Sequence, residues 1–207
     1  MKYLFYGFLV LLCMSCNRAA FQSKWTTEQA PSTYIVRFET SKGSFDVKIT
    51  REWSPLAADR FYQLIRHRVY DNALFYRVVP NFVAQFGSSD TAKIEKWMPY
   101  KIPDEAVVHP NQTGSLAFAR SGKETRGREV FINLKDNPRL DTITYNGVKG
   151  FPAFGDVVSG MDVVSALYSG YGDKTMPRLG AMYRNRKRFI DTFPGLDVIH
   201  KVSILKN

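Results

Sequence analysis

Short segments in which apolar and polar residues alternate, separated by turn signals, constrain the fold of this chain most. Apolar or aromatic residues occupy positions 34, 36 and 38, a Ser-Lys-Gly turn signal follows at 41–43, and positions 45, 47 and 49 are apolar again. Alternation with a period of two on both sides of a glycine-containing turn predicts a β-hairpin. Similar segments predict further strands over 74–79, 82–86, 114–119, 130–134, 154–159 and 197–205.

Helical signals are few and scattered. Ser54 and Pro55 mark a helix start, with Ser54 as the N-cap and the proline in the first turn, where its missing N–H is tolerated. An apolar face continues to Val69, and residues 160–167 predict a second, short helix. Strands and helices do not alternate regularly, which argues against a parallel, doubly wound sheet. We therefore expect a mainly β protein with an antiparallel barrel, because closure removes exposed sheet edges.

The N-terminus has the features of an export signal. Lys2 precedes an apolar run at 3–14, which is shorter than the roughly 20 residues that a spanning helix needs. Ser15 and Cys16 follow, and the segment resembles a bacterial lipoprotein signal, which is cut before a cysteine that becomes lipid-modified. The alternative is a plain secretory signal with an unrelated cysteine. The expected organisation is a signal peptide at 1–15, lipidation at Cys16, a tether at 16–32 and one domain at 33–207.

Cysteine usage limits the chemistry of that domain. Cys13 and Cys16 are the only cysteines, and both lie in the N-terminal segment. Their C-x-x-C spacing therefore predicts neither redox nor metal chemistry in the domain, which has no disulfide. The segment 17–32 has no clear period and predicts a flexible tether, in which Phe21 and Trp25 either enter the lipid interface or pack on the domain.

The net charge of +10 does not by itself indicate a partner. The basic cluster at 184–188 predicts either a solvated helix face or a surface that attracts anionic lipid headgroups. Export and the lack of an aromatic stacking platform argue against nucleic acid. A hydrolase is excluded because the chain has only three histidines and neither a G-x-S-x-G nor an H-E-x-x-H motif. Among those histidines, His67 is expected to be solvated at a helix end.

Five motifs in the same order carry a family resemblance. They are FYRVVPNFVAQFG at 75–87, YKIPDE at 100–105, GSLAFAR at 114–120, VFINL at 130–134 with LD at 140–141, and FGDVVSGMDVV at 154–164. The chain resembles the cyclophilins, the peptidyl-prolyl cis/trans isomerases, from about residue 34 to residue 167. The resemblance implies a closed eight-stranded antiparallel barrel capped by two helices. It implies no cofactor and no metal.

The resemblance also implies a role for each matching residue. Arg77 is implied to be the catalytic residue, a donor aimed at the proline nitrogen, which regains its lone pair when the X–Pro amide twists. Gln85 is implied to hold Arg77 or the substrate carbonyl, and Ala119 and Arg120 to supply backbone contacts to the bound peptide. The apolar proline pocket is implied at Phe82, Val83, Phe131 and Leu140, with Glu129 and Phe151 at further substrate-binding positions.

Several residues depart from the family pattern. Glu129 stands at a usual glutamine, lacks the amide donor, and can pair with Arg77 or Arg120 and compete for the catalytic guanidinium. Arg139 stands at a frequent tryptophan, and Phe151 at a usual histidine or tyrosine. Two functions therefore stay open: an isomerase that is active but weak, with an altered preference for the residue before proline, and a non-catalytic scaffold that binds proline-containing peptides.

The expected setting follows from the N-terminus and the family. The expected partners are proline-containing unfolded or partly folded proteins and, through the lipid, a membrane, with the protein a monomer that assists folding in the bacterial cell envelope, facing the periplasm or the cell surface. Residues 168–195 are an extra C-terminal insert relative to the family. Within it we expect a flexible turn at 168–173 and a helix over 178–193 with Met182, Phe189 and Phe193 on one face.

Overall fold

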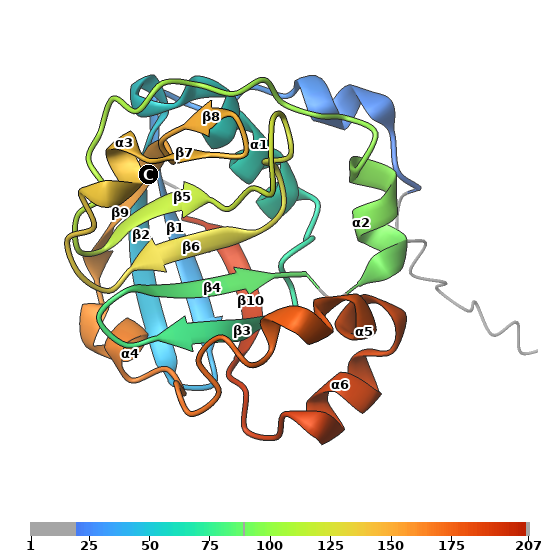
Figure 1. Cartoon of the computed structure of the whole chain (residues 1–207). Coiled ribbons are helices and arrows are strands. Elements are labelled where there is room, and N and C mark those ends of the chain that lie inside the picture. Colours follow the sequence, from blue (N-terminus) through green and yellow to red (C-terminus); the bar gives the residue numbers. More distant parts are fainter. Residues whose placement is uncertain (1–19, 89, 206–207) are drawn as a thin grey trace, which may run out of the picture.

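Eight antiparallel strands close into a barrel in the computed structural model, which describes residues 20–88 and 90–205 (Figure 1). Around the barrel the order is β1-β10-β3-β4-β6-β5-β9-β2. This confirms the predicted mainly β fold and the closed barrel. The strands are β1 (Thr33–Thr40), β2 (Gly43–Thr50), β3 (Ala73–Val79), β4 (Val83–Gly87), β5 (Ser115–Phe118), β6 (Val130–Asn133), β9 (Ala153–Ser159) and β10 (Val198–Ile204), and a small separate ribbon pairs β7 (Thr144–Tyr145) with β8 (Val148–Lys149).

Short helices surround the barrel. They are α1 (Pro55–Arg66), α2 (Thr91–Trp97), α3 (Arg139–Thr142), α4 (Met161–Ser165), α5 (Leu179–Arg184) and α6 (Arg186–Thr192), with 3₁₀ turns η1 (Ser23–Thr27), η2 (Arg51–Trp53) and η3 (Met176–Arg178). In Figure 1, α1 lies at the upper end of the barrel and α4 at the lower end, as the two capping helices were expected to do. Within the described ranges, no helix combines the length and the apolar character needed to cross a bilayer.

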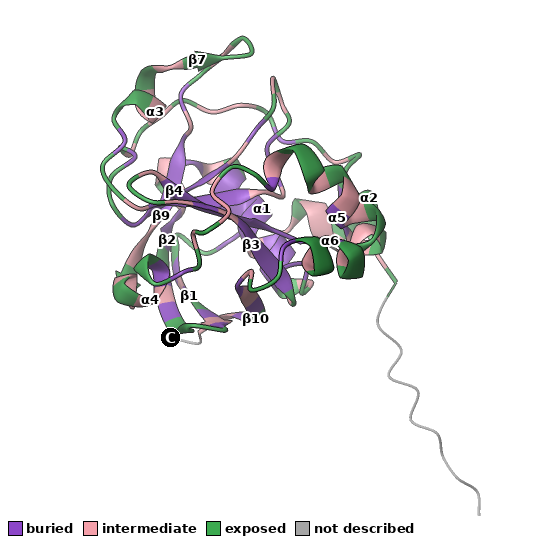
Figure 2. Cartoon of the chain, turned by 60° about the horizontal axis from the view of Figure 1, so that its bottom comes forward, coloured by how far each residue is buried: buried purple, intermediate pink, exposed green. Residues whose placement is uncertain are grey.

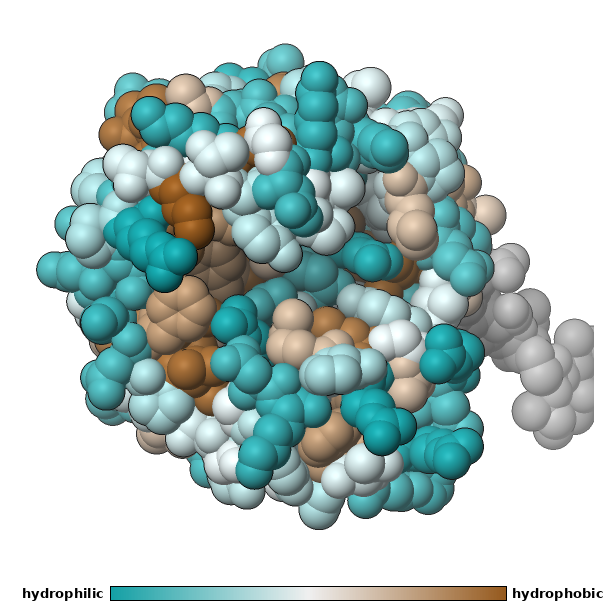
Figure 3. Space-filling model, viewed as in Figure 1, coloured by the Kyte–Doolittle hydropathy of each residue, from teal (hydrophilic) through white to brown (hydrophobic). Residues whose placement is uncertain are grey.

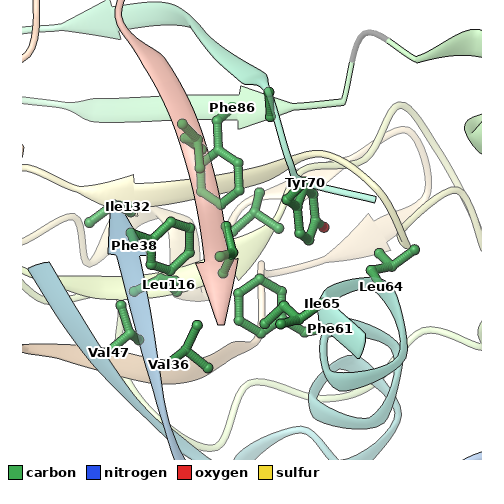
Figure 4. Close-up of a cluster of buried hydrophobic side chains, with 14 of the residues drawn as sticks. Val36, Phe38, Val47, Phe61, Leu64, Ile65, Tyr70, Phe86, Leu116 and Ile132 are labelled. Carbon is green, nitrogen blue, oxygen red and sulfur yellow. The ribbon is translucent and has the colours of Figure 1, made fainter. Parts of the chain in front are cut away.

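The barrel interior is filled by apolar side chains that the alternating pattern predicted. Val36 and Phe38 of β1 and Val47 of β2 point inward and are fully buried (Figure 4). Phe61 of α1 closes the core from the end of the barrel. The ligand-binding surface of this molecule therefore has to lie outside the barrel, because its interior is packed with side chains.

Helix α1 begins where the sequence predicted, but Ser54 does not cap it. Ser54 Oγ instead donates to Glu105, whose carboxylate accepts the backbone N–H of Leu56 at 2.8 Å and of Ala57 at 3.2 Å. A carboxylate at the positive end of the helix dipole satisfies the free N–H groups that a serine hydroxyl was expected to satisfy. The cap comes from a residue about fifty positions away, which no local pattern reveals.

The described part of the predicted tether, residues 20–32, packs against the domain. Phe21 contacts Trp97 of α2 edge-to-face at 5.3 Å between ring centroids. Gln63 of α1 donates through Nε2 to the carbonyls of Thr26, at 3.1 Å, and Glu28, at 2.7 Å. The alternative in which Phe21 and Trp25 pack on the domain is therefore confirmed. Residues 20–32 are not a free tether, because their aromatic side chains and carbonyls contact α1 and α2. Cys16 lies outside the described residues.

His67 is partnered rather than solvated. Its ring stacks on Trp25 at 3.8 Å between centroids, and its Nε2 lies 3.3 Å from Glu28 Oε1. The expectation of a solvated histidine is wrong because the N-terminal segment covers the end of α1. His67 thus fastens this segment to the domain.

The insert at 168–195 packs against the outside of β3. The predicted helix over 178–193 is broken at Asn185, whose side chain accepts from Arg188 N and starts α6. Met182, Phe189 and Phe193 face the barrel as predicted and form one buried cluster with Leu74 and Tyr76 of β3. Figure 2 shows the opposite faces of α5 and α6 exposed.

One expectation for the insert needs correction. The turn at 168–173 is held in place, because Tyr168 N donates to Asp197 Oδ2 at 2.6 Å and Tyr171 OH donates to the Pro194 carbonyl at 2.9 Å. The basic cluster presents a solvated face, one of the two alternatives, since Arg184, Lys187 and Arg188 are exposed; Lys187 pairs with exposed Asp191, and Arg186 donates to the Asn72 carbonyl.

Candidate active site

A β-bulge in β3 places two neighbouring side chains on the outer face of the barrel. Phe75 pairs with Phe86 and Arg77 pairs with Gln85, so Tyr76 is an extra residue on β3. Strict alternation would send Arg77 into the core, opposite to Tyr76. The bulge instead turns both residues outward, and a bulge of this kind commonly re-aims a side chain beside an active site.

Arg77 is held from two sides. Its Nη1 donates to Gln85 Oε1 at 3.0 Å, and its Nε donates to Asp173 Oδ1 at 2.6 Å. The guanidinium carbon lies 5.4 Å from the ring centroid of Phe82. Nη2 makes no hydrogen bond to any residue in the described ranges, so its N–H groups can donate to a ligand. Gln85 therefore holds the arginine, one of the two roles that the sequence left open.

An apolar patch lies next to this guanidinium on the outer face of β4, β5 and β6. Figure 3 shows apolar side chains in the wall of a hollow over these strands, with hydrophilic residues around it. The patch unites every residue predicted for the proline pocket and adds Ala117, which shares a strand face with Ala119. Its members are Phe82, Val83, Ala117, Ala119, Phe131, Leu140 and Phe151.

A cavity of about 520 Å³ opens beside the apolar patch. Phe82, Leu140 and Phe151 belong to both, and Arg139 and Tyr145 form part of the cavity's outer wall. Its volume lies within the range of about 300–1,000 Å³ that is usual for ligand sites. Arg139, which departs from the family's tryptophan, is exposed here and leaves the cavity open.

Glu129 does not pair with Arg77 or Arg120. Its Oε2 accepts from Tyr76 OH at 2.6 Å, its Oε1 accepts from Tyr183 OH of the insert, and only 14% of its side chain is exposed. Burial raises the pKa of this carboxyl, while the hydrogen bonds from the two tyrosines act in the opposite direction. The expected competition for the catalytic guanidinium is therefore wrong, because the tyrosines occupy the carboxylate.

Tyr76 links Glu129 to the arginine. Gln85 Nε2 donates to Tyr76 OH at 2.8 Å, so hydrogen bonds run from Arg77 through Gln85 and Tyr76 to Glu129. Each amide and hydroxyl along this path is fixed by its neighbour, which orients Gln85 toward Arg77. No sequence pattern indicates a role for Tyr76, although it precedes Arg77 in the motif at 75–87.

The Arg120 side chain makes contacts that the sequence did not predict. It donates to the carbonyls of Tyr145, at 3.1 Å, Val148, at 2.9 Å, and Gly150, and its guanidinium carbon lies 4.2 Å from the Phe151 ring centroid. These contacts hold the β7–β8 ribbon and fix Phe151 against the pocket, where its ring meets Phe131 edge-to-face at 5.9 Å. Whether the backbone at 119–120 contacts a peptide stays a prediction.

A buried amide network supports the pocket from behind and was also missed. Asn137 Nδ2 donates to the Phe82 carbonyl at 3.0 Å and to Asn133 Oδ1 at 2.7 Å. Asn111 Nδ2 donates to the Phe151 carbonyl at 2.8 Å and to Asp141 Oδ1 at 2.7 Å. Two opposite walls of the pocket are thus fixed through their backbones, and the asparagines carry no sequence signal for this role.

The sequence model of one family, described as cyclophilin type peptidyl-prolyl cis-trans isomerase/CLD, matches residues 35–182, more than half of the chain. The chain belongs to the cyclophilin family. The predicted family and enzyme class are thereby confirmed: this is a cyclophilin-type peptidyl-prolyl cis-trans isomerase. The match runs from β1 into α5 and leaves out the last strand of the barrel, β10.

Relatives and solved structures agree with this assignment. A peptidyl-prolyl cis-trans isomerase of Acinetobacter baylyi is 32% identical over 135 residues, which are 64% of this chain and 71% of the relative. One from Arabidopsis thaliana is 35% identical over 144 residues, 68% of this chain and 84% of the relative. A crystal structure of a cyclophilin-type isomerase from Cryptosporidium parvum shares the fold, with a TM-score of 0.63, 19% identity, and 84% of this chain and 99% of that chain covered. The Cryptosporidium protein has also been solved in the presence of the dipeptide Ala-Pro.

Proposed function

We propose that this cyclophilin catalyses X–Pro isomerisation through Arg77 and assists the folding of proteins in a bacterial cell envelope. The observation that carries the catalytic part is the guanidinium of Arg77, fixed beside the apolar patch with Nη2 unoccupied by any described residue. Proline fits such a patch because its ring is apolar and its nitrogen has no N–H. A peptide bound there presents the amide nitrogen to the arginine.

The chemistry is a rotation, so no bond is exchanged. Twisting the X–Pro amide breaks its resonance, against a barrier of about 18–20 kcal/mol. The nitrogen becomes pyramidal and regains a lone pair, which accepts a hydrogen bond only in the twisted state. An N–H of Arg77 aimed at this nitrogen therefore binds the transition state better than either planar state, as catalysis requires.

Arg77 does not supply the whole acceleration. A rate gain of about 10⁵ needs roughly 7 kcal/mol of differential binding. One hydrogen bond to a charged group contributes about 1.5–3 kcal/mol. The remainder comes from the apolar pocket, which excludes water that would stabilise the planar amide, and from the rigid placement of Arg77 by Gln85.

The proposed location rests on the N-terminal sequence. Lys2, the apolar run at 3–14 and Cys16 are the features of a lipid-anchored envelope protein. Phe21 is packed on the domain, so a lipid at Cys16 would hold the domain within about 18 Å of the membrane, the reach of five extended residues. A free tether over 17–32 would have a longer reach.

The catalytic proposal is tested by measuring cis/trans exchange in a proline tetrapeptide with the full chain in detergent. We expect acceleration that falls by roughly 10- to 150-fold in Arg77→Ala, the loss of one hydrogen bond from a charged group. Arg37→Ala is the matched control, since Arg37 lies on β1 and is paired with Asp46 of β2; this change should leave the rate unchanged. A folded protein that binds the peptide without accelerating exchange would show a scaffold instead.

The anchor is tested separately by labelling cells with radioactive palmitate. We expect the label in the wild-type protein and in Cys13→Ala, and its loss in Cys16→Ala together with release from the membrane fraction. Label that persists in Cys16→Ala, or its absence from the wild type, would contradict the lipid anchor and leave the catalytic proposal untouched.

A further inference from the structure

Asp173 belongs to the insert, yet it lies against the residue proposed to be catalytic. Arg77 Nε donates to Asp173 Oδ1 at 2.6 Å across 96 positions of sequence. The Asp173 side chain is 64% exposed and that of Arg77 is 20% exposed. The contact therefore lies at the rim of the site, with the carboxylate between the arginine and solvent.

The backbone around Asp173 is built to keep it there. Thr175 is fully buried, and its hydroxyl donates to the carbonyl of Tyr76, the residue next to Arg77 on β3. Met176 N donates to the Asp173 carbonyl at 3.0 Å, and Lys174 N donates to the Tyr171 carbonyl at 2.9 Å. The last two bonds hold the turn at 171–176 in shape, and the Thr175 bond joins it to β3. The Asp173 carboxylate therefore reaches the guanidinium without any movement of the backbone.

Asp173 and Gln85 accept hydrogen bonds from different nitrogens of the Arg77 guanidinium. Asp173 accepts from Nε, Gln85 accepts from Nη1, and Nη2 donates to no residue in the described ranges. A guanidinium gripped at two of its three nitrogens cannot rotate about its last side-chain torsion without breaking a hydrogen bond. The free edge is thereby aimed at one place.

We propose that Asp173 is a positioning residue of the isomerase, through which the insert fixes the guanidinium of Arg77 for catalysis. The proposal rests on the catalytic role of Arg77. It predicts that removing Asp173 lowers kcat more than it raises KM, because the carboxylate acts on the orientation of Arg77 rather than on the peptide. Asn in its place keeps an acceptor oxygen, so it should restore most of the rate.

The kinetic experiment uses the full chain and an uncharged proline tetrapeptide. We expect Asp173→Ala to lose about five- to tenfold in kcat/KM and Asp173→Asn to stay within about twofold of wild type. Asp191→Ala is the control, since Asp191 lies in the same insert and pairs with Lys187 away from the site. Because exposed ion pairs are screened, the wild-type rate should fall between about 10 mM and 1 M salt, while that of Asp173→Asn should not.

A spectroscopic experiment tests the contact without relying on turnover. The Nε–H resonance of Arg77 in ¹⁵N-labelled protein is assigned by its loss in Arg77→Lys. We expect slow exchange of this proton with water in the wild type and in Asp191→Ala, and exchange about tenfold faster or more in Asp173→Ala.

The outcomes separate this inference from the proposed function. Unchanged Nε–H exchange and unchanged kcat in Asp173→Ala would overturn the positioning role while Arg77→Ala still lowers activity. A rate that rises in Asp173→Ala would also overturn it, since Asp173 would then block the guanidinium. If the wild type does not accelerate exchange at all, the function fails, and the Nε–H measurement still decides whether Asp173 holds Arg77.

Discussion

Gln85 and Arg77 face each other across the β3–β4 pair and are joined by a hydrogen bond of 3.0 Å from Arg77 Nη1 to Gln85 Oε1. The bulge at Tyr76 brings a second side chain of β3 to the same glutamine, whose Nε2 donates to Tyr76 OH. One glutamine thus orients the arginine and is itself oriented by the tyrosine. The geometry of the proposed active site is therefore set by a local irregularity of the barrel.

Replacing Gln85 should lower activity more than stability. Gln85→Leu removes the acceptor for Arg77, and losing about 1 kcal/mol of orientation corresponds to roughly a fivefold fall in kcat/KM. Tyr76→Phe should lower the rate less, because it acts only through Gln85. The two changes should not add in a double-mutant cycle of kcat/KM. Additive effects would contradict a path from Tyr76 through Gln85.

Glu129 should make stability depend on pH in a specific direction. Burial raises the pKa of Glu129 in the folded protein above its ordinary value of 4.5. At pH values between 4.5 and the folded-state pKa, the folded state therefore binds more protons than the unfolded state. The free energy of unfolding therefore falls as pH rises through this window. Glu129→Gln does not titrate, so its stability relative to wild type should increase with pH from 4.5 upward, as measured by urea unfolding at a series of pH values.

A control variant distinguishes this pH dependence of stability from the general effect of removing a carboxylate. Glu39→Gln removes an exposed acid on β1, whose side chain is 45% exposed and pairs with Lys201. Its stability relative to wild type should not follow the pattern of Glu129→Gln. The same trend in both variants would mean that Glu129 has no special pH dependence.

Gly87 is needed because Glu129 occupies the space beside it. A Cβ at position 87 would lie 1.9 Å from Glu129 Oε2, so Gly87→Ala should destabilise the fold by about 1–3 kcal/mol. Removing the carboxylate with Glu129→Ala should relieve the clash, and the double variant should be more stable than the sum of the single changes. Gly122→Ala, where the nearest atom would be 3.9 Å away, is the control and should be nearly neutral in thermal unfolding.

Arg120 should matter through its side chain. Arg120→Lys cannot bond three carbonyls and stack on Phe151 at once, so we expect a loss of about 1.5–3 kcal/mol and a higher KM for peptide. Amide hydrogen exchange should become faster over 144–150. Arg37→Ala, on β1 and outside the cavity, should change neither the KM nor the exchange over 144–150. Normal exchange at 144–150 in Arg120→Lys would show that other contacts hold the ribbon.

Local patterns in the sequence were enough to predict the barrel and the residues of the pocket. Alternation placed Val36, Phe38 and Val47 on the inner face because side chains of a strand point to opposite sides with a period of two. The ordered motifs identified Arg77, Gln85 and the apolar residues that the structure unites in one patch. The same patterns predicted the buried face of the insert at Met182, Phe189 and Phe193.

The contacts that hold these residues in place depend on how remote parts of the chain pack together. The bulge that turns Arg77 outward breaks the alternation from which strands are predicted, so a regular pattern places that residue on the wrong face. Asp173 and Tyr183 reach Arg77 and Glu129 across 96 and 54 positions, and the N-terminal segment finds α1 and α2 in the same way. These contacts form between residues that become neighbours only when the chain packs. A local sequence pattern carries no information about the distance in space between remote residues.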